Sequence, residues 1–275
     1  MTRLNRTEKI PAGIDRVATF GAEHLLSPVS ICTDIQGNIY VGDEASVGVH
    51  KFTPDYAYEM AFGDFGQAES QLLAPIDLFC DGFTIYVVDG WNERIAKYDR
   101  NGGFLGIFAP VGTDTLGTGL PVAVAVSASG EMFVLETRPG QVVALDEYGR
   151  SRSVFGRFGG GTGLSMPTAM ALGPGSEVYV CDRGGRIVIY DPFGGYLGEI
   201  RGFGSLSDIA IDLAGNVYVS DLDAGTVTCY DRRGNSVASL TGLTAPRALA
   251  LTEEKTLLVV DSENGSVVVC EIRFR

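Results

Sequence analysis

Hydrophobic and polar residues alternate along most of the chain in short runs, and the runs are separated by turns rich in glycine, aspartate and asparagine. The alternation has a period of two and favours β-branched and aromatic residues, which is typical of β-strands. No stretch shows a convincing helical period. The pattern therefore predicts an all-β protein.

One segment recurs six times along the chain, as apolar alternation that ends in a pattern close to Ile/Val-Tyr-Val-x-Asp. The segments lie at 37–43, 84–89, 130–136, 176–182, 215–221 and 256–261. Each ends in an acidic residue, and these are Asp43, Asp89, Glu136, Asp182, Asp221 and Asp261. Such a regular recurrence indicates a repeat architecture.

Each repeat contains four short apolar segments. The first is usually opened by proline, at Pro28, Pro75, Pro121, Pro167 and Pro246, with Leu206 in the fifth repeat. The recurring segment comes next, and a third strand, a turn and a fourth strand follow. Four strands at this spacing are typical of a propeller blade. We therefore predict a single six-bladed β-propeller over 1–275, with four-stranded antiparallel blades at about 28–63, 75–108, 121–156, 167–200, 206–240 and 246–275.

The sixth repeat stops after its third strand, and the N-terminal part of the chain supplies a candidate for the missing one. Residues 15–20 resemble the fourth strands of the other repeats. We expect this segment to complete the last blade. Such a closure leaves no free sheet edge that could pair with another molecule.

The second repeat carries a more specific motif: Pro75, then 85–89 (IYVVD), 92–95 (NERI), Tyr98-Asp99, and Gly102 with Phe104. This motif resembles the NHL repeat, and the resemblance extends over almost the whole chain. It implies a stand-alone NHL-type propeller without an attached effector domain. Members of this family bind proteins, bind RNA or, in one branch, act as lyases, so the resemblance implies the fold and leaves the function open.

Charge and composition narrow the choice of partners. With 21 basic and 34 acidic residues the net charge is −13, and most nucleic-acid affinity comes from Lys and Arg on phosphates. Nucleic acid and anionic membranes are therefore unfavourable partners. No apolar run approaches the length of a membrane span, the start lacks the apolar region of a secretory signal, and the five widely spaced cysteines fit reduced thiols. These features predict a cytoplasmic protein.

Several repeated residues have a structural interpretation. The acids that end the second strands recur in every blade, and we expect Asp89 to pair with Arg94 and Asp182 with Arg186. The aromatic residues within the recurring segment are expected in the core between blades. They are Tyr40, Tyr86, Phe133, Tyr179 and Tyr218.

The loops between second and third strands share one rim of the propeller with the spacers between blades, and we call this rim the upper face. The spacers 63–74, 109–120 and 156–166 are long and consecutive, so one half of this face carries extra chain. Irregular loops on a rigid scaffold are frequent binding sites, and Trp and Arg often anchor interfaces. The predicted contact residues on blades two to four are Trp91, Asn92, Arg94, Arg138, Arg183 and Arg186. The alternatives are that Trp91 packs on its own loop and that the arginines pair with blade acids.

The first strands line the central channel of a propeller. Two positions after the opening residue stand Ser30, Asp77, Ala123, Ala169, Asp208 and Ala248. In a six-fold ring Asp77 and Asp208 lie across the axis, and Arg247 is placed to neutralise Asp208. Two carboxylates without further oxygen ligands make a poor calcium site, so we predict no metal and no cofactor.

Catalytic motifs are scarce. The chain has two histidines, His24 and His50, whereas the lyase branch of the family uses several around zinc, and no nucleophile elbow or Walker loop is present. We therefore expect a protein-binding or scaffolding propeller, of which a fixed subunit of a larger assembly is one version. The alternatives are a metal-dependent lyase or lactonase with its site in the channel, and an RNA-binding NHL domain.

Overall fold

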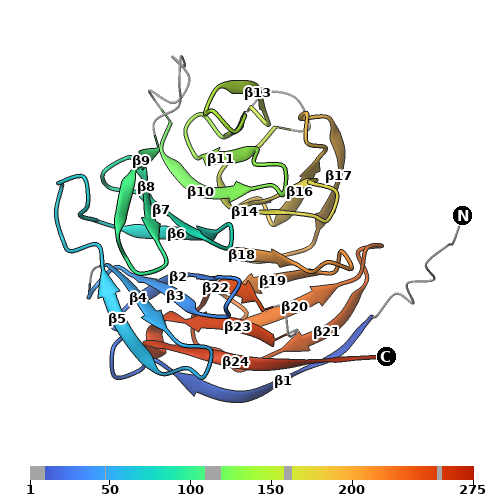
Figure 1. Ribbon diagram of the computed structural model, residues 1–275. Helices are drawn as coiled ribbons and strands as arrows, with labels where there is room; N and C mark the ends of the chain where they lie inside the picture. Colours follow the sequence, from blue (N-terminus) through green and yellow to red (C-terminus); the bar gives the residue numbers. More distant parts are fainter. Residues whose placement is uncertain (1–9, 47, 109–118, 158–162, 253–255) are drawn as a thin grey trace, which may run out of the picture.

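The computed structural model describes residues 10–46, 48–108, 119–157, 163–252 and 256–275, and it contains six four-stranded antiparallel sheets around a common centre (Figure 1). Blades one to three contain β2 (Pro28–Thr33), β3 (Ile39–Asp43), β4 (Gly48–Phe52) and β5 (Tyr58–Phe62); β6 (Pro75–Cys80), β7 (Thr84–Asp89), β8 (Arg94–Asp99) and β9 (Phe104–Phe108); and β10 (Pro121–Val126), β11 (Met132–Glu136), β12 (Gln141–Leu145) and β13 (Ser151–Phe155). Blades four and five contain β14 (Pro167–Leu172), β15 (Val178–Asp182), β16 (Arg186–Tyr190) and β17 (Tyr196–Arg201); and β18 (Leu206–Ile211), β19 (Val217–Asp221), β20 (Thr226–Tyr230) and β21 (Ser236–Leu240). The six-bladed propeller predicted from the repeat is confirmed.

The sixth blade joins the two ends of the described chain. It contains β22 (Pro246–Leu251), β23 (Thr256–Asp261), β24 (Ser266–Phe274) and β1 (Pro11–Phe20), with β1 at its outer edge beside β24 (Figure 1). The predicted closing strand is therefore present, and it is longer than residues 15–20. The pairing runs from Phe20 opposite Val267 to Pro11 opposite Phe274, because β24 extends far enough to give the earlier residues partners.

The acids that end the second strands fasten the spacers to the blades. The Asp261 carboxylate accepts the backbone N–H groups of Thr244 at 3.1 Å and Ala245 at 2.7 Å, the last two residues before the opening proline. Asp43, Asp89, Asp182 and Asp221 accept the equivalent pairs of amides. Glu136 differs: Gln141 donates to one oxygen, and among the described residues its Oε1 has no partner. The recurring acid is thus explained by the fold.

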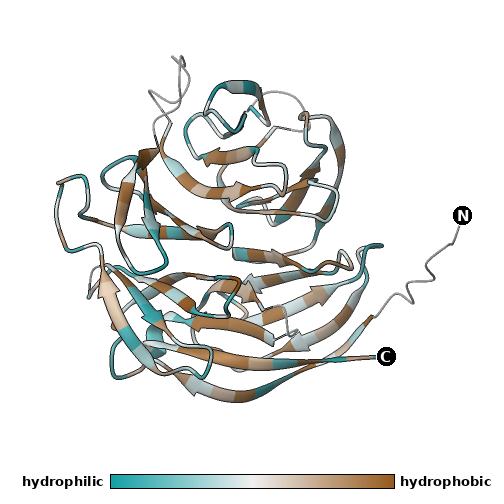
Figure 2. Ribbon diagram, in the orientation of Figure 1, coloured by the Kyte–Doolittle hydropathy of each residue, from teal (hydrophilic) through white to brown (hydrophobic). Residues whose placement is uncertain are grey.

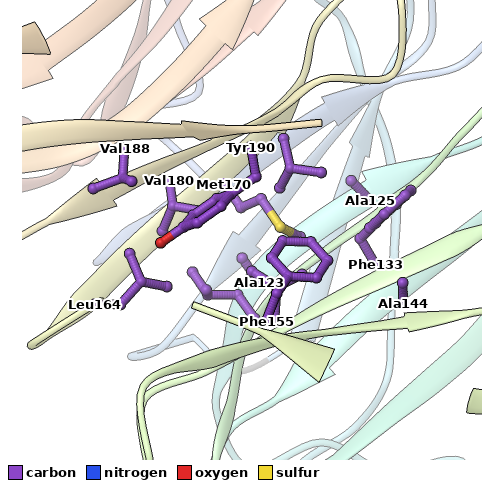
Figure 3. Packing of buried hydrophobic residues seen from close by; sticks show 13 residues of the cluster. Ala123, Ala125, Phe133, Ala144, Phe155, Leu164, Met170, Val180, Val188 and Tyr190 are labelled. Carbon is purple, nitrogen blue, oxygen red and sulfur yellow. The ribbon is translucent and has the colours of Figure 1, made fainter. Parts of the chain in front are cut away.

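The hydrophobic core lies between neighbouring blades. Figure 3 shows such a cluster between blades three and four, in which Phe133, Phe155, Met170 and Tyr190 pack together. Tyr40, Phe133 and Tyr218 are fully buried as predicted, whereas Tyr86 and Tyr179 are half-buried. Hydrophobic residues follow the strands and hydrophilic residues gather in the turns (Figure 2).

Glycine stands directly before the third strand in most blades, where the chain turns at the upper face. Gly185 has a φ of 68°, and a Cβ there would lie 2.5 Å from the carbonyl oxygen of Phe203. The position therefore requires both a left-handed backbone and a close approach to the spacer. Within the described residues the one helical segment is a short 3₁₀ turn, η1 (Ser262–Asn264), and no helix is long and apolar enough to cross a membrane. All five cysteines are unpaired, as expected.

Candidate functional site

A cavity of about 660 Å³ opens at the upper end of the central channel. The first strand of each blade lies innermost, and all six of these innermost strands contribute to the cavity wall: β2, β6, β10, β14, β18 and β22. Loops between second and third strands and some spacer residues complete the wall. Asp77, Arg138, Arg183, Asp208 and Arg247 all line it, so part of the predicted upper-face set and the predicted channel set share one cavity.

Asp77 and Asp208 each connect two neighbouring innermost strands. Asp77 Oδ2 accepts the backbone N–H of Val124 on β10 at 2.9 Å, and Asp208 Oδ2 accepts that of Leu249 on β22 at 2.7 Å. The N–H of Ile209 donates to the other oxygen of Asp208 at 2.7 Å. Both carboxyls therefore have a structural role between blades.

Burial raises the pKa of both channel carboxyls. The pKa of Asp77 rises to about 6, although the amides that it accepts oppose the rise. The pKa of Asp208 rises to about 8, first through burial and then through the nearby charge of Asp77. The electrostatic effect of Asp77 on Asp208 agrees with the predicted placement of the two across the channel.

The predicted neutralisation of Asp208 by Arg247 is wrong. Across the described ranges no ion pair joins them, and the Arg247 side chain is exposed in the cavity. Backbone amides occupy both oxygens of Asp208 instead, as described above. Arg247 is held through its backbone, whose carbonyl accepts the Ser207 hydroxyl at 2.6 Å.

Asn92, Arg94 and Arg186 are engaged within the fold. The predicted ion pairs are present, with Arg94 Nε 3.3 Å from Asp89 and Arg186 Nη2 2.9 Å from Asp182. Arg94 also donates to the carbonyls of Ala68 and Gln71, and Asn92 donates to Gly66. Arg186 donates to the carbonyl of Gly163 and to the carboxylate of Glu199. These bonds hold the spacers on the blades, and the predicted contact role of the three residues stays a prediction.

Trp91 lies in the loop after β7 with 76% of its surface exposed. The alternative that it packs on its own loop is therefore wrong. Phe65, on the spacer that Asn92 and Arg94 bind, is 64% exposed. We call the two aromatic residues and the exposed acids near them in sequence the Trp91 surface, made of Asp64, Phe65, Glu69, Trp91 and Glu93. Sequence reasoning missed Phe65, because a phenylalanine in a glycine-rich spacer does not reveal whether it is buried.

Only part of the three long spacers predicted on the upper face lies within the described residues. Spacer 63–74 is ordered by the bonds given above, whereas 109–118 and 158–162 lie outside the described residues. Neither histidine lines the cavity. The ring of His24 stacks on that of Tyr58 with the ring centroids 3.8 Å apart, and His50 Nε2 lies 2.9 Å from Ser46 Oγ. Among the described residues no group of three or more His, Cys, Asp or Glu side chains is placed to hold a metal ion.

Comparison with known proteins supports the fold. No family model and no curated protein matches the sequence, so membership of the NHL-repeat family stays a prediction. A streptogramin B lyase superposes with a TM-score of 0.63 at 10% identity, over 90% of this chain and 94% of that one. A chain from a nidogen–laminin complex gives 0.65 at 14% identity over 78% and 80%, and virginiamycin B lyase from Staphylococcus aureus gives 0.60 at 12% over 89% and 81%. At such low identity the similarity shows the six-bladed propeller fold alone.

Proposed function

We propose that this propeller is a protein-binding module and that the Trp91 surface on blade two forms the centre of its contact area. The observation that carries the proposal is the exposure of Trp91 on a loop that is itself well ordered. Tryptophan buries a large apolar area when it enters a pocket and is among the most frequent interface anchors. With 76% of its surface exposed, Trp91 contributes little such burial in the free protein.

The loop that presents Trp91 is fixed before any partner arrives. Asn92 Nδ2 lies 2.5 Å from Asp89 and 3.2 Å from the Gly66 carbonyl, and Arg94 binds two more carbonyls of the spacer. The spacer is therefore joined to the loop and to the start of β8 by side-chain hydrogen bonds. A preorganised contact surface loses less conformational entropy on association.

The negative charge of the Trp91 surface indicates what kind of partner it binds. Asp64, Glu69 and Glu93 are exposed, and none forms an ion pair in the part of the chain that the structure describes. They lie within four residues of Phe65 or Trp91 in the sequence, and the whole chain carries a net charge of −13. We infer a partner with an apolar pocket bordered by Lys or Arg, whose association rate falls as salt rises.

The comparisons support a binding role without choosing the partner. A propeller of this fold occurs in a nidogen–laminin complex, whereas two other similar structures are lyases. No observation at the cavity of this chain favours lyase chemistry, so we do not propose that activity.

The test uses Trp91 as its own reporter, because it is the only tryptophan of the chain. Immobilised protein captures partners from its native cells, and each purified candidate is then titrated against it while the tryptophan emission is recorded. Binding at this surface shifts the emission of the wild type to shorter wavelength. Trp91→Ala lacks this reporter, so its affinity is measured by titration calorimetry, and binding is expected to be weaker by about 2 kcal/mol or more, as for a central aromatic anchor.

Phe193 provides a matched control. It is 75% exposed and lies on the opposite face, in the turn between β16 and β17. Phe193→Ala is expected to leave the affinity unchanged. If a partner binds wild type and Trp91→Ala equally, and the tryptophan emission of the wild type does not change on binding, the Trp91 surface is not the contact.

A further inference from the structure

At the level of the residue after the opening position, the wall of the central cavity has an apolar half and a polar half, while Leu206 and Leu222 add apolar lining on blade five. In every innermost strand the residue after the opening position lines the cavity, and these residues are Val29, Ile76, Val122, Thr168, Ser207 and Arg247. Innermost strands of consecutive blades contact one another around the ring, and the last contacts the first. The three apolar residues of blades one to three are therefore adjacent, and so are the three polar residues of blades four to six.

Three arginines line the same cavity without partners. Arg247 belongs to the polar side, and Arg138 and Arg183 come from the loops of blades three and four. Over the residues that the structure describes, their guanidinium groups make no ion pair and no hydrogen bond. All three side chains are exposed, so their charges are available to a ligand in a chain with 34 acidic and 21 basic residues. On the same face Arg94 and Arg186 are both fully engaged.

Among the described residues, the acidic residues of the cavity form no ion pair with its arginines. Asp77 and Asp208 lie one residue further along their strands, deeper from the mouth, and accept backbone amides. Glu44 lies on the rim of blade one, which is opposite blade four and its Arg183 in a six-fold ring. A negative group in the cavity is thus repelled from Glu44 and attracted to Arg183 opposite, whereas Arg247 lies on blade six, next to blade one.

We propose that the cavity binds a small organic anion, with its oxyanion group between Arg183 and Arg247 and its apolar body against Val29, Ile76 and Val122. The guanidinium group matches carboxylate, sulfonate and phosphate oxygens with paired donors. The apolar wall provides burial for a hydrocarbon or aromatic body. The volume of about 660 Å³ is that of an ordinary small-molecule pocket. This site does not depend on the Trp91 surface.

Anilinonaphthalene sulfonate is a suitable probe, because it combines an aromatic body with one anionic group and fluoresces when it is desolvated. Titration of the native protein is expected to give saturable binding of one probe per chain. The variant Arg183→Ala/Arg247→Ala should weaken it by about tenfold or more, since the charge-assisted hydrogen bonds to the anion are lost. Val122→Thr should weaken it several-fold by making the apolar wall polar. Arg233→Ala, in a turn outside the cavity, is the matched control and should have no effect.

A neutral analogue, phenylnaphthylamine, separates the anion site from general apolar adsorption. Its binding should be weaker and should not respond to the double arginine variant. The proposal is overturned if the wild type binds no sulfonate probe, if the double variant binds it as tightly as the wild type, or if the neutral analogue loses the same affinity. Melting curves of each variant verify folding. Should the double variant not fold, Arg183→Lys/Arg247→Lys retains the charges without the paired donors and is expected to bind more weakly than the wild type, and equal affinity there would also refute the site.

Discussion

Asp182 ends β15 in blade four, and its carboxylate is fully buried at the point where a spacer, a loop and a strand meet. It accepts the backbone N–H of Met166 at 2.7 Å and both polar groups of Ser165 at 3.0–3.2 Å. Arg186 donates from Nε at 3.0 Å and from Nη2 at 2.9 Å. Asp182→Asn preserves the shape of this side chain, removes its charge and places an amide donor among groups that are all donors.

The expected loss follows from these contacts. Removing one partner of a buried ion pair costs about 3–5 kcal/mol, because the other charge stays buried. Arg186 is 11% exposed and retains Glu199 at 3.2 Å, which offsets part of the loss. We therefore expect about 3 kcal/mol, and for a chain of this size each kcal/mol lowers Tm by roughly 2 °C, about 6 °C in all.

Thermal and urea unfolding followed by circular dichroism, with tryptophan emission as a second probe, measures this change. Asp191→Asn is the control, because Asp191 accepts amides of the exposed turn after β16 and its loss should cost less than about 1 kcal/mol. Asp182→Asn/Arg186→Met removes the stranded cation and should recover part of the stability.

The pH dependence gives an independent check. Burial alone would raise the pKa of Asp182, but the amide of Met166, Arg186 and Ser165 outweigh it and hold the pKa below its usual range. Its stabilising effect is thus present above the unfolded pKa of about 4 and is lost as pH falls through the lower folded value. The difference between wild type and Asp182→Asn should shrink in acid. A loss below about 1 kcal/mol at neutral pH would show that the repeated acids do not fasten the spacers, and Arg186 would become available for the predicted contact.

Two further predictions concern the loops and the channel. Gly185→Ala should cost about 1–2 kcal/mol or more, because its φ is left-handed and its Cβ would meet the Phe203 carbonyl, whereas Gly184→Ala has open space and should be near neutral in the same unfolding assay; equal effects would contradict the close approach. Asp208 has a pKa raised to about 8, so stability falls as pH rises from about 4 to about 8, because the carboxyl ionises in the unfolded chain while it stays protonated in the folded one. The Tm of the wild type should therefore fall relative to that of Asp208→Asn between about pH 5 and about pH 8, and parallel profiles would show that the carboxyl is not desolvated.

The fold was predictable because its information is local and repeated. Period-two alternation defines each strand, and six copies of one pattern define six blades. The extension of β1 to Pro11 was missed, since residues 11–14 show no alternation of their own and pair only because β24 continues opposite them. For the candidate site, the sequence indicated which residues lie on the upper face and in the channel better than it indicated what these residues bind. Trp91 is exposed and Asp77 and Asp208 line the cavity, where their contact roles stay predictions, whereas Asn92, Arg94 and Arg186 hold spacers in place.

The sequence by itself determined the strand pattern, the number of blades, the acid at the end of each second strand and the negative charge of the whole molecule, because each is a property of residue order or composition. Only the tertiary structure decided which polar groups are satisfied. Asp208 meets an amide 41 residues away on the next blade instead of the guanidinium of Arg247, and Arg186 is neutralised where Arg183, three positions earlier, is not. That difference depends on distances across the ring, which the spacing along one strand does not contain.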